Sequence, residues 1–254
     1  MIFESHAHYE DKRFDEDRDI LLKQMKESGI DKIVNVGSNL ETTKQTIALT
    51  EQYDFIYGAV GVHPSDIECL DEAAFAWLKD MTSGEKVVAV GEIGLDYYWD
   101  KEPKVQENQR YWFIRQLALA REVSLPVIIH SRDAAADTLA IMKEHARDMQ
   151  GVIHCFSYGK EMAEEYLKMG FYIGIGGVVT FKNAKKVKEV VEMCPLSRIL
   201  LETDSPYLAP EPNRGKRNNS LNLIYVAEEI AKIKGISVEE VTEVTYRNAK
   251  ELYF

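Results

Sequence analysis

Two hydrophobic patterns alternate along the chain. Short apolar runs rich in β-branched residues predict buried strands, and longer segments with apolar residues every three or four positions predict amphipathic helices. Strands are predicted over residues 1–8, 32–38, 56–64, 87–96, 126–132, 151–156, 172–177 and 199–206. Helical periodicity is clearest in residues 17–28, 106–123, 134–145, 162–169, 221–234 and 238–254.

This alternation predicts an α/β fold with a parallel sheet. Eight strand–helix units that close once are the simplest way to bury strands that are apolar on both faces. We therefore predict a single (β/α)8 TIM barrel over residues 1–254, with a C-terminal helical extension and no second domain. The alternative is an open doubly wound sheet, which normally carries a phosphate-binding glycine loop after its first strand, where this chain has His6-Ala7-His8.

Composition narrows the class of protein only a little. The net charge of −11 argues against a protein that coats nucleic acid with a broad basic surface. It is compatible with a nuclease, because bound cations and a few basic side chains can grip one or two phosphates. The sequence has no signal peptide, no membrane-spanning run and no pair of closely spaced cysteines, so we expect a cytoplasmic protein with reduced thiols and no membrane partner. A monomer is the default expectation.

Histidines cluster at the ends of the predicted strands. Five of the six follow this rule, and the C-terminal ends of the strands build the active site of this kind of barrel. His6 and His8 lie two positions apart on one strand, so both imidazoles can face the same metal ion. His130 and His154 close two further strands. Any one of these histidines alone would more often be a hydrogen-bonded residue of the core.

Two carboxylates complete the candidate metal site. Glu92 lies within an apolar strand, where a buried carboxylate needs a partner such as a pair of metal ions; an exposed or ion-paired glutamate is the alternative. Asp204 ends the last predicted strand. Four imidazoles with two carboxylates suit zinc, manganese or magnesium.

These segments carry a resemblance that runs through the whole chain. The sequence is similar to the TatD-like metal-dependent deoxyribonucleases of the amidohydrolase superfamily. The shared segments are Ser5-His6-Ala7-His8, Gly61-Val62-His63-Pro64, Gly91-Glu92-Ile93-Gly94-Leu95-Asp96, His130-Ser131-Arg132-Asp133, His154-Cys155-Phe156-Ser157, Glu202-Thr203-Asp204-Ser205-Pro206 and Arg214-Gly215-Lys216-Arg217-Asn218. Glu4 departs from the family pattern, which usually has aspartate there.

The resemblance implies a metal-dependent deoxyribonuclease that hydrolyses phosphodiester bonds, acting on single strands or from a 3′ end. It implies two divalent ions, Mg, Mn or Zn. One ion would be held by His6, His8 and Asp204, the other by His130 and His154, with Glu92 shared between them. Asp204 is also the candidate for orienting or deprotonating the attacking water; pure ligation is the alternative.

Further residues are candidates for contact with DNA. His63 lies outside the implied ligand set and is expected to contact the substrate phosphate or the leaving group, unless it is structural. Candidate phosphate contacts, each of which could instead be solvated, are Arg132, Arg214, Lys216 and Arg217. Tyr97, followed by Tyr98 and Trp99, could stack on unpaired bases or pack at the barrel rim. Strand alternation predicts that the Cys155 thiol points away from the metals.

Two other functions remain open at this point. The same metals could serve an amide, ester or lactone hydrolase, or a deaminase, since one barrel mouth supports many reactions; RNA or a small phosphodiester is also open. A metal-binding scaffold without activity is the third class. The complete ligand set argues against it, because substituted ligands would be the expected trace of lost activity.

Overall fold

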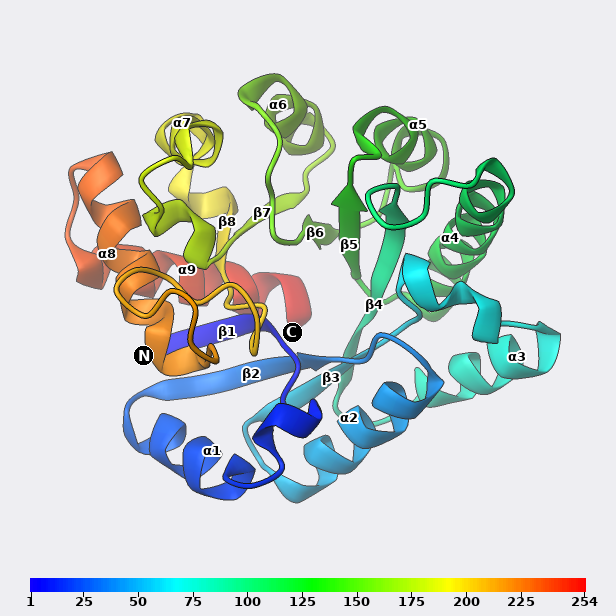
Figure 1. The fold of residues 1–254 in the computed structure, drawn as a ribbon, viewed down its shortest axis with the longest axis horizontal. Helices are drawn as coiled ribbons and strands as arrows, with labels where there is room; N and C mark the ends of the chain where they lie inside the picture. The colour runs from blue at the N-terminus through cyan, green and yellow to red at the C-terminus, as the bar shows by residue number, and fades with distance from the viewer.

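The strands close into a ring. The computed structural model describes residues 1–254 and places eight strands in one sheet, in the order β1 to β8, with every neighbouring pair parallel. A bridge between Ala7 and Ser205 joins the first strand to the segment after the last. Helices surround the strands (Figure 1). The predicted TIM barrel is confirmed.

The elements follow one another as strand and helix along the chain. The strands are β1 Ile2–Ala7, β2 Ile30–Val36, β3 Ile56–Val60, β4 Val87–Asp96, β5 Val127–Arg132, β6 Gly151–Ile153, β7 Tyr172–Ile175 and β8 Ile199–Leu201. The helices are α1 Arg18–Glu27, α2 Leu40–Gln52, α3 Glu72–Met81, α4 Pro103–Val123, α5 Ala135–His145, α6 Lys160–Lys168, α7 Lys185–Met193, α8 Leu223–Lys234 and α9 Val238–Tyr253. No helix has the length and apolarity needed to cross a bilayer.

The core has two main layers. A cluster of 44 buried residues fills the space between the strands and the outer helices. A second cluster of 13 residues takes at least one side chain from every strand, together with Ala249, Leu252 and Tyr253 of α9. Tyr246 of the same helix donates to Asp31 at the start of β2. Helix α9 therefore closes the end of the barrel where the strands begin, and the opposite end is left for the site.

Several strands end earlier than the hydrophobic pattern predicts. β6 stops at Ile153 and β8 at Leu201, where the predicted strands continue to residues 156 and 206. Beyond these ends the backbone turns sharply, with positive φ angles of 45° at Cys155 and 55° at Asp204. Such angles cost about 1–3 kcal/mol at a non-glycine residue and are typical of functional sites.

One glycine sets the contact between β4 and β5. Gly94 has a φ of 148°, and a Cβ there would lie 1.9 Å from the carbonyl oxygen of His130. Only glycine allows this close approach. It holds the strand that carries Glu92 directly against the strand that carries His130.

Candidate metal centre

Glu92 lies at the centre of the barrel mouth and is only 4% exposed. Its Oε1 lies 2.7 Å from His130 Nδ1 and 2.7 Å from His154 Nε2. Its Oε2 faces the other side, 3.5 Å from His6 Nε2 and 3.8 Å from His8 Nε2. The two oxygens thus divide the four imidazoles into two pairs.

Asp204 joins the first pair. Its Oδ1 lies 3.4 Å from His8 Nε2 and 3.7 Å from His6 Nε2. The sharp turn after β8 brings this carboxylate back over the end of β1, where the Asp204 N–H also donates to the carbonyl of His6. All six side chains predicted as ligands therefore meet at one place.

The donor set fits divalent cations. His6 Nε2 and His8 Nε2 face each other at 3.1 Å, and His130 Nδ1 and His154 Nε2 do so at 3.3 Å. Two ring nitrogens this close need a proton or a cation between them, because their lone pairs otherwise repel. Imidazole and carboxylate ligands suit several divalent metals.

The charges of the site also indicate that it needs bound cations or protons. Burial lowers the pKa of His130, but hydrogen bonds to Asp96 and Glu92 outweigh it and raise that pKa to about 9. Burial would raise the pKa of Glu92, but the neighbouring charge of His154 and the hydrogen bonds from His130 and His154 hold it well below its usual range. The buried carboxylate is thus compensated by protonated imidazoles in the metal-free site, and bound cations would displace those protons.

Two of the imidazoles have partners that hold them in place. His8 Nδ1 lies 2.8 Å from the carbonyl oxygen of Val36, so Nδ1 donates and Nε2 is left free to face the site. His130 Nε2 lies 3.1 Å from Asp96 Oδ2. Such outer partners fix the orientation of metal-binding histidines.

Glu4 is a buried carboxylate whose structural role the sequence did not reveal. It accepts hydrogen bonds from the N–H and hydroxyl of Thr203, the hydroxyl of Ser220 and the N–H of His6. It therefore ties β1, the loop that carries Asp204 and the start of the last helical segment together. Burial raises the pKa of Glu4 to about 7, although these hydrogen bonds oppose the shift. The signals were an acidic residue in the apolar run of β1 and the aspartate that the family usually has at this position.

His63 also faces the centre. Its Nε2 lies 3.7 Å from Glu92 Oε1, while its Nδ1 accepts the N–H of Ser65 at the start of a short 3-10 helix, Pro64–Cys69. A neutral ring with an accepting Nδ1 carries its proton on Nε2. His63 is thus arranged to donate into the site.

The candidate DNA-contacting residues differ in how exposed they are and in whether other residues of the protein already bind them. Arg132 is exposed at the end of β5, and its guanidinium lies 3.9 Å above the ring of Tyr98 and 5.5 Å from that of Trp99. Tyr98 is 41% exposed and Trp99 67%. Tyr97 instead packs partly buried against the core, and its hydroxyl donates to Asp137.

The basic loop after β8 is partly engaged with the protein itself. Arg217 forms a two-pronged ion pair with Asp17. Arg214 lies over the ring of Phe181 at 4.2 Å and is exposed, as is Lys216. Arg214 and Lys216 are therefore freer to meet a phosphate than Arg217.

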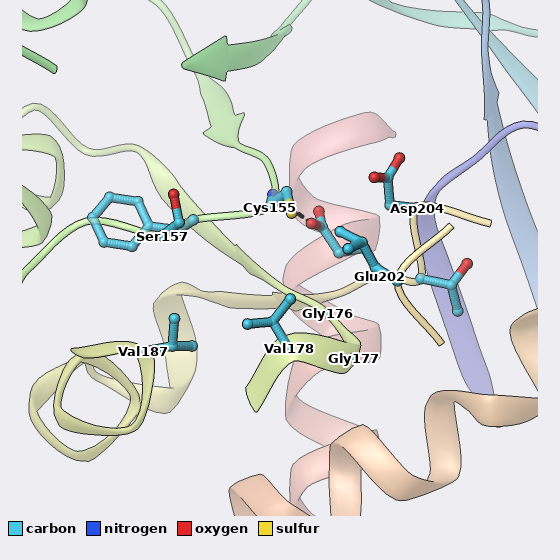
Figure 2. A pocket seen from close by; sticks show the side chains of 11 residues that line it. Cys155, Ser157, Gly176, Gly177, Val178, Val187, Glu202 and Asp204 are labelled. Carbon is cyan, nitrogen blue, oxygen red and sulfur yellow. Dashed lines mark hydrogen bonds between the residues drawn. The ribbon is translucent and has the colours of Figure 1, made fainter. Parts of the chain in front are cut away.

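Cys155 lies just beyond the end of β6. It lines a cavity of about 30 Å³ with Asp204 and Glu202 among its other walls (Figure 2). Because β6 ends at Ile153 and the backbone turns at Cys155, strand alternation does not decide where the thiol points, and its direction relative to the metals stays a prediction.

A parallel barrel with imidazoles and carboxylates gathered at the ends of its strands defines the class of metal-dependent barrel hydrolases. The family model described as TatD related DNase matches residues 3–254. The chain belongs to this TatD family.

Relatives from several organisms cover the chain. The uncharacterized metal-dependent hydrolase YabD of Bacillus subtilis (strain 168) is 47% identical over 100% of this chain and 99% of its own length. A mouse relative, named "Putative deoxyribonuclease TATDN3", is 33% identical over 99% of this chain and 88% of its own. The crystal structure of YjjV, a TatD homolog from Escherichia coli K12, superposes with a TM-score of 0.93 at 30% identity, covering 99% of this chain and 97% of that one.

Glu4 gives the metal-free protein a defined pH dependence. The pKa of its carboxyl is about 7 in the folded chain against an ordinary value of 4.5, so between these values the folded protein holds a proton that the unfolded chain has released. The free energy of unfolding therefore falls as the pH rises through this window. In Glu4→Gln, whose amide keeps the hydrogen bonds because the hydroxyls can rotate, we expect this fall to shrink by up to about 1.4 kcal/mol per pH unit.

Urea unfolding of metal-free wild type and variant between about pH 5 and 7 measures this difference. Glu161→Gln, at an exposed carboxylate in the first turn of α6, is the control and should follow the wild type. Parallel curves for wild type and Glu4→Gln would contradict the assignment.

Proposed function

We propose that the protein is a deoxyribonuclease that hydrolyses phosphodiester bonds of DNA at a pair of divalent ions, acting on single strands or from a 3′ end. The whole chain, residues 1–254, acts as one catalytic unit in this proposal. The observation that carries it is the division of the imidazoles by the two oxygens of Glu92. The match of residues 3–254 to the TatD related DNase model supports the choice of DNA.

The stacked rings of His6 and His154 support two ions over one. Their centroids lie 4.0 Å apart and their planes differ by only 11°. A metal binds in the plane of an imidazole, about 2 Å from the nitrogen. Two nearly parallel rings stacked in this way do not direct their in-plane lone pairs at one point, so in this proposal His6 and His154 would serve different ions.

In this proposal His6, His8 and Asp204 would hold one ion, His130 and His154 would hold the other, and both ions would share Glu92. When bound, the ions lower the pKa of a water and stabilise negative charge on the phosphate and the leaving oxygen. Magnesium, manganese and zinc all suit these ligands.

The protein's own residues then complete the reaction. Asp204, whose Oδ1 faces the histidines, has its second oxygen for orienting the attacking water and accepting its proton. His63 donates its Nε2–H to the phosphate or to the departing oxygen. Arg132 grips a phosphate through its planar guanidinium, with Arg214 and Lys216 at the opposite rim.

Tyr98 and Trp99 extend the site toward the bases. Together with Arg132 they form an exposed aromatic and cationic surface beside Asp96, a partner of His130. Unpaired bases stack on such surfaces without sequence preference. In the structure these two residues suit the stacking role better than Tyr97, whose ring is packed and whose hydroxyl is bonded. The cytoplasmic location and monomeric state expected from the sequence stay predictions.

Glu92→Ala tests the metal mechanism. We expect metal-stripped wild type to cleave end-labelled single- and double-stranded DNA when magnesium, manganese or zinc is returned. The cleavage rate of the variant should fall by more than about 100-fold. Mutating a residue that only hydrogen-bonds to a metal ligand typically costs about 10–100-fold in metal affinity or activity, and removing a ligand shared by both ions should cost more. Glu72→Ala, which removes an exposed carboxylate of α3, should keep full activity.

The products separate the alternatives. A ladder that shortens from one end indicates an exonuclease, and internal fragments indicate an endonuclease. If wild type cleaves no DNA with any metal but hydrolyses amide, ester or lactone substrates, the DNA proposal is wrong and the metal site serves the other class.

Tyr98→Ala tests the stacking surface. The truncation removes the ring but keeps the Tyr98 N–H that donates to Asp96, so the metal site should be undisturbed. We expect binding of a single-stranded oligonucleotide to weaken by about 1–3 kcal/mol. Hydrolysis of a small chromogenic phosphodiester should be unchanged. Tyr111→Ala, at a comparably exposed tyrosine of α4 away from the mouth, is the control. Equal effects of the two variants on the oligonucleotide would count against the assignment.

A further inference from the structure

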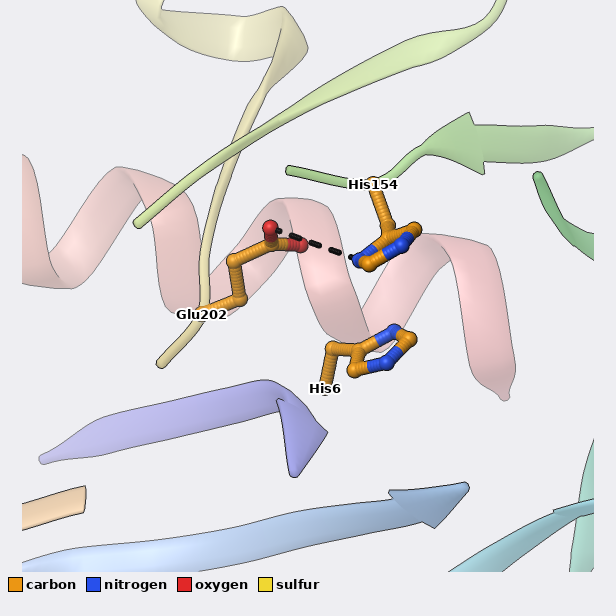
Figure 3. A group of neighbouring side chains, drawn as sticks. All are labelled: His6, His154 and Glu202. Atoms are coloured by element: carbon orange, nitrogen blue, oxygen red, sulfur yellow. Dashed lines mark ion pairs between the residues drawn. The ribbon is translucent and has the colours of Figure 1, made fainter. Parts of the chain in front are cut away.

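Three buried polar atoms without a hydrogen-bond partner gather beneath the candidate metal centre. They are His6 Nδ1, His154 Nδ1 and Glu202 Oε2, three of only four such side-chain atoms in the protein. One nitrogen of each ring and one oxygen of the carboxylate lie within 4.8 Å of one another. Figure 3 shows the Glu202 carboxylate pointing toward the edges of the two rings.

The Glu202 carboxylate is held firmly in this position. The N–H of Cys155 donates to its Oε1 at 2.5 Å. On the other side, a Cβ at Gly174 of β7 would lie 2.3 Å from Oε2, so only a glycine leaves room for the carboxylate. Glu202 is fully buried, and a buried carboxylate in a fixed place needs donors.

The unpartnered atoms complement one another. When Nε2 of a neutral imidazole faces a metal ion, the proton lies on Nδ1 and must be donated. The proposed pair of metal ions therefore leaves two buried Nδ1–H donors, on His6 and His154, beside one buried acceptor, the Glu202 carboxylate. Each buried group left unpaired would cost about 1–3 kcal/mol.

We propose that Glu202 is a positioning residue that accepts hydrogen bonds from the Nδ1–H groups of His6 and His154, and so orients one ligand of each ion. The inference rests on the proposed metal pair and is independent of the DNA substrate. His154 Nδ1 lies 3.8 Å from Glu202 Oε1, and one ring nitrogen of His6 lies within 4.8 Å of a Glu202 oxygen. Neither Nδ1 atom has a hydrogen-bond partner in the metal-free protein, so a small movement of the side chains completes the two contacts.

A third ion at this place is the alternative, and the ring geometry opposes it. The planes of His6 and His154 differ by 11° with centroids 4.0 Å apart, so their Nδ1 lone pairs cannot point at a common ion. Two separate hydrogen bonds to the two oxygens of one carboxylate have no such restriction.

Glu202 differs from the other outer partners in serving both ions. The carbonyl of Val36 holds only His8, and Asp96 holds only His130. Replacing Glu202 should therefore weaken the binding of both ions, whereas replacing Asp96 should weaken the binding of one.

The test measures metal binding, not activity. Metal-free wild type, Glu202→Gln and Asp96→Asn are titrated with zinc in competition with a chromophoric chelator. We expect two ions per wild-type chain, about 10–100-fold weaker binding of both ions in Glu202→Gln, and weaker binding of one ion in Asp96→Asn. Thermal unfolding of the metal-free proteins checks that each variant is folded.

Nitrogen-edited NMR of zinc-loaded wild type gives a second readout that needs no variant. We expect His6 and His154 to carry their protons on Nδ1, with slow exchange against water. Unprotonated Nδ1 atoms, unchanged zinc affinity in Glu202→Gln, or a third wild-type ion lost in that variant would each overturn the inference. A wild type that binds fewer than two ions would instead contradict the metal pair itself.

Discussion

The architecture of the site depends on one desolvated anion. Glu92 is almost fully buried within a fully buried strand, and a charge taken out of water must be compensated nearby. The structure surrounds it with imidazoles from β1, β5 and the end of β6, and His63 from the end of β3 adds another. Each of these rings needs its own support, from Asp96, from the Val36 carbonyl or, in our proposal, from Glu202. The buried imidazoles of the mouth therefore surround one carboxylate, and the other buried polar groups hold those imidazoles in place.

A second carboxylate joins distant parts of the chain. Glu4 bonds to Thr203 and Ser220, about 200 residues away in sequence, at the point where the barrel closes. The loop that carries Asp204 lies beyond the end of β8, and one isolated bridge, between Ala7 and Ser205, joins its backbone to β1. Glu4 adds side-chain hydrogen bonds to this bridge. The same hydrogen bonds therefore help to close the barrel and to place Asp204.

The fold followed from the sequence because periodicity is a local signal. The strand and helix patterns predicted eight strands and six of the nine helices, missing α2, α3 and α7, and the polar residues closing the strands marked the mouth. The ends of β6 and β8 were predicted too late, since the predicted strands ran on through the turns at Cys155 and Asp204, which depend on contacts with neighbouring segments.

The six candidate ligands could be located from sequence because they end strands of a known architecture and carry a family resemblance. Their supporting residues could not. Glu4 and Glu202 are acidic residues in apolar runs, and nothing in the sequence shows which distant donors face them. The stacking of Arg132 on Tyr98 and the ion pair of Arg217 with Asp17 likewise depend on contacts between segments far apart in the chain.

The central claim is that Glu92 separates two metal positions. Anomalous diffraction from crystals of the wild-type protein grown with manganese tests it directly. The account predicts two peaks, about 3.5–4 Å apart, one beside Glu92 Oε2 with His6, His8 and Asp204 and the other beside Oε1 with His130 and His154. A single peak contacted by all of these residues, or a peak among His6, His154 and Glu202, would contradict it.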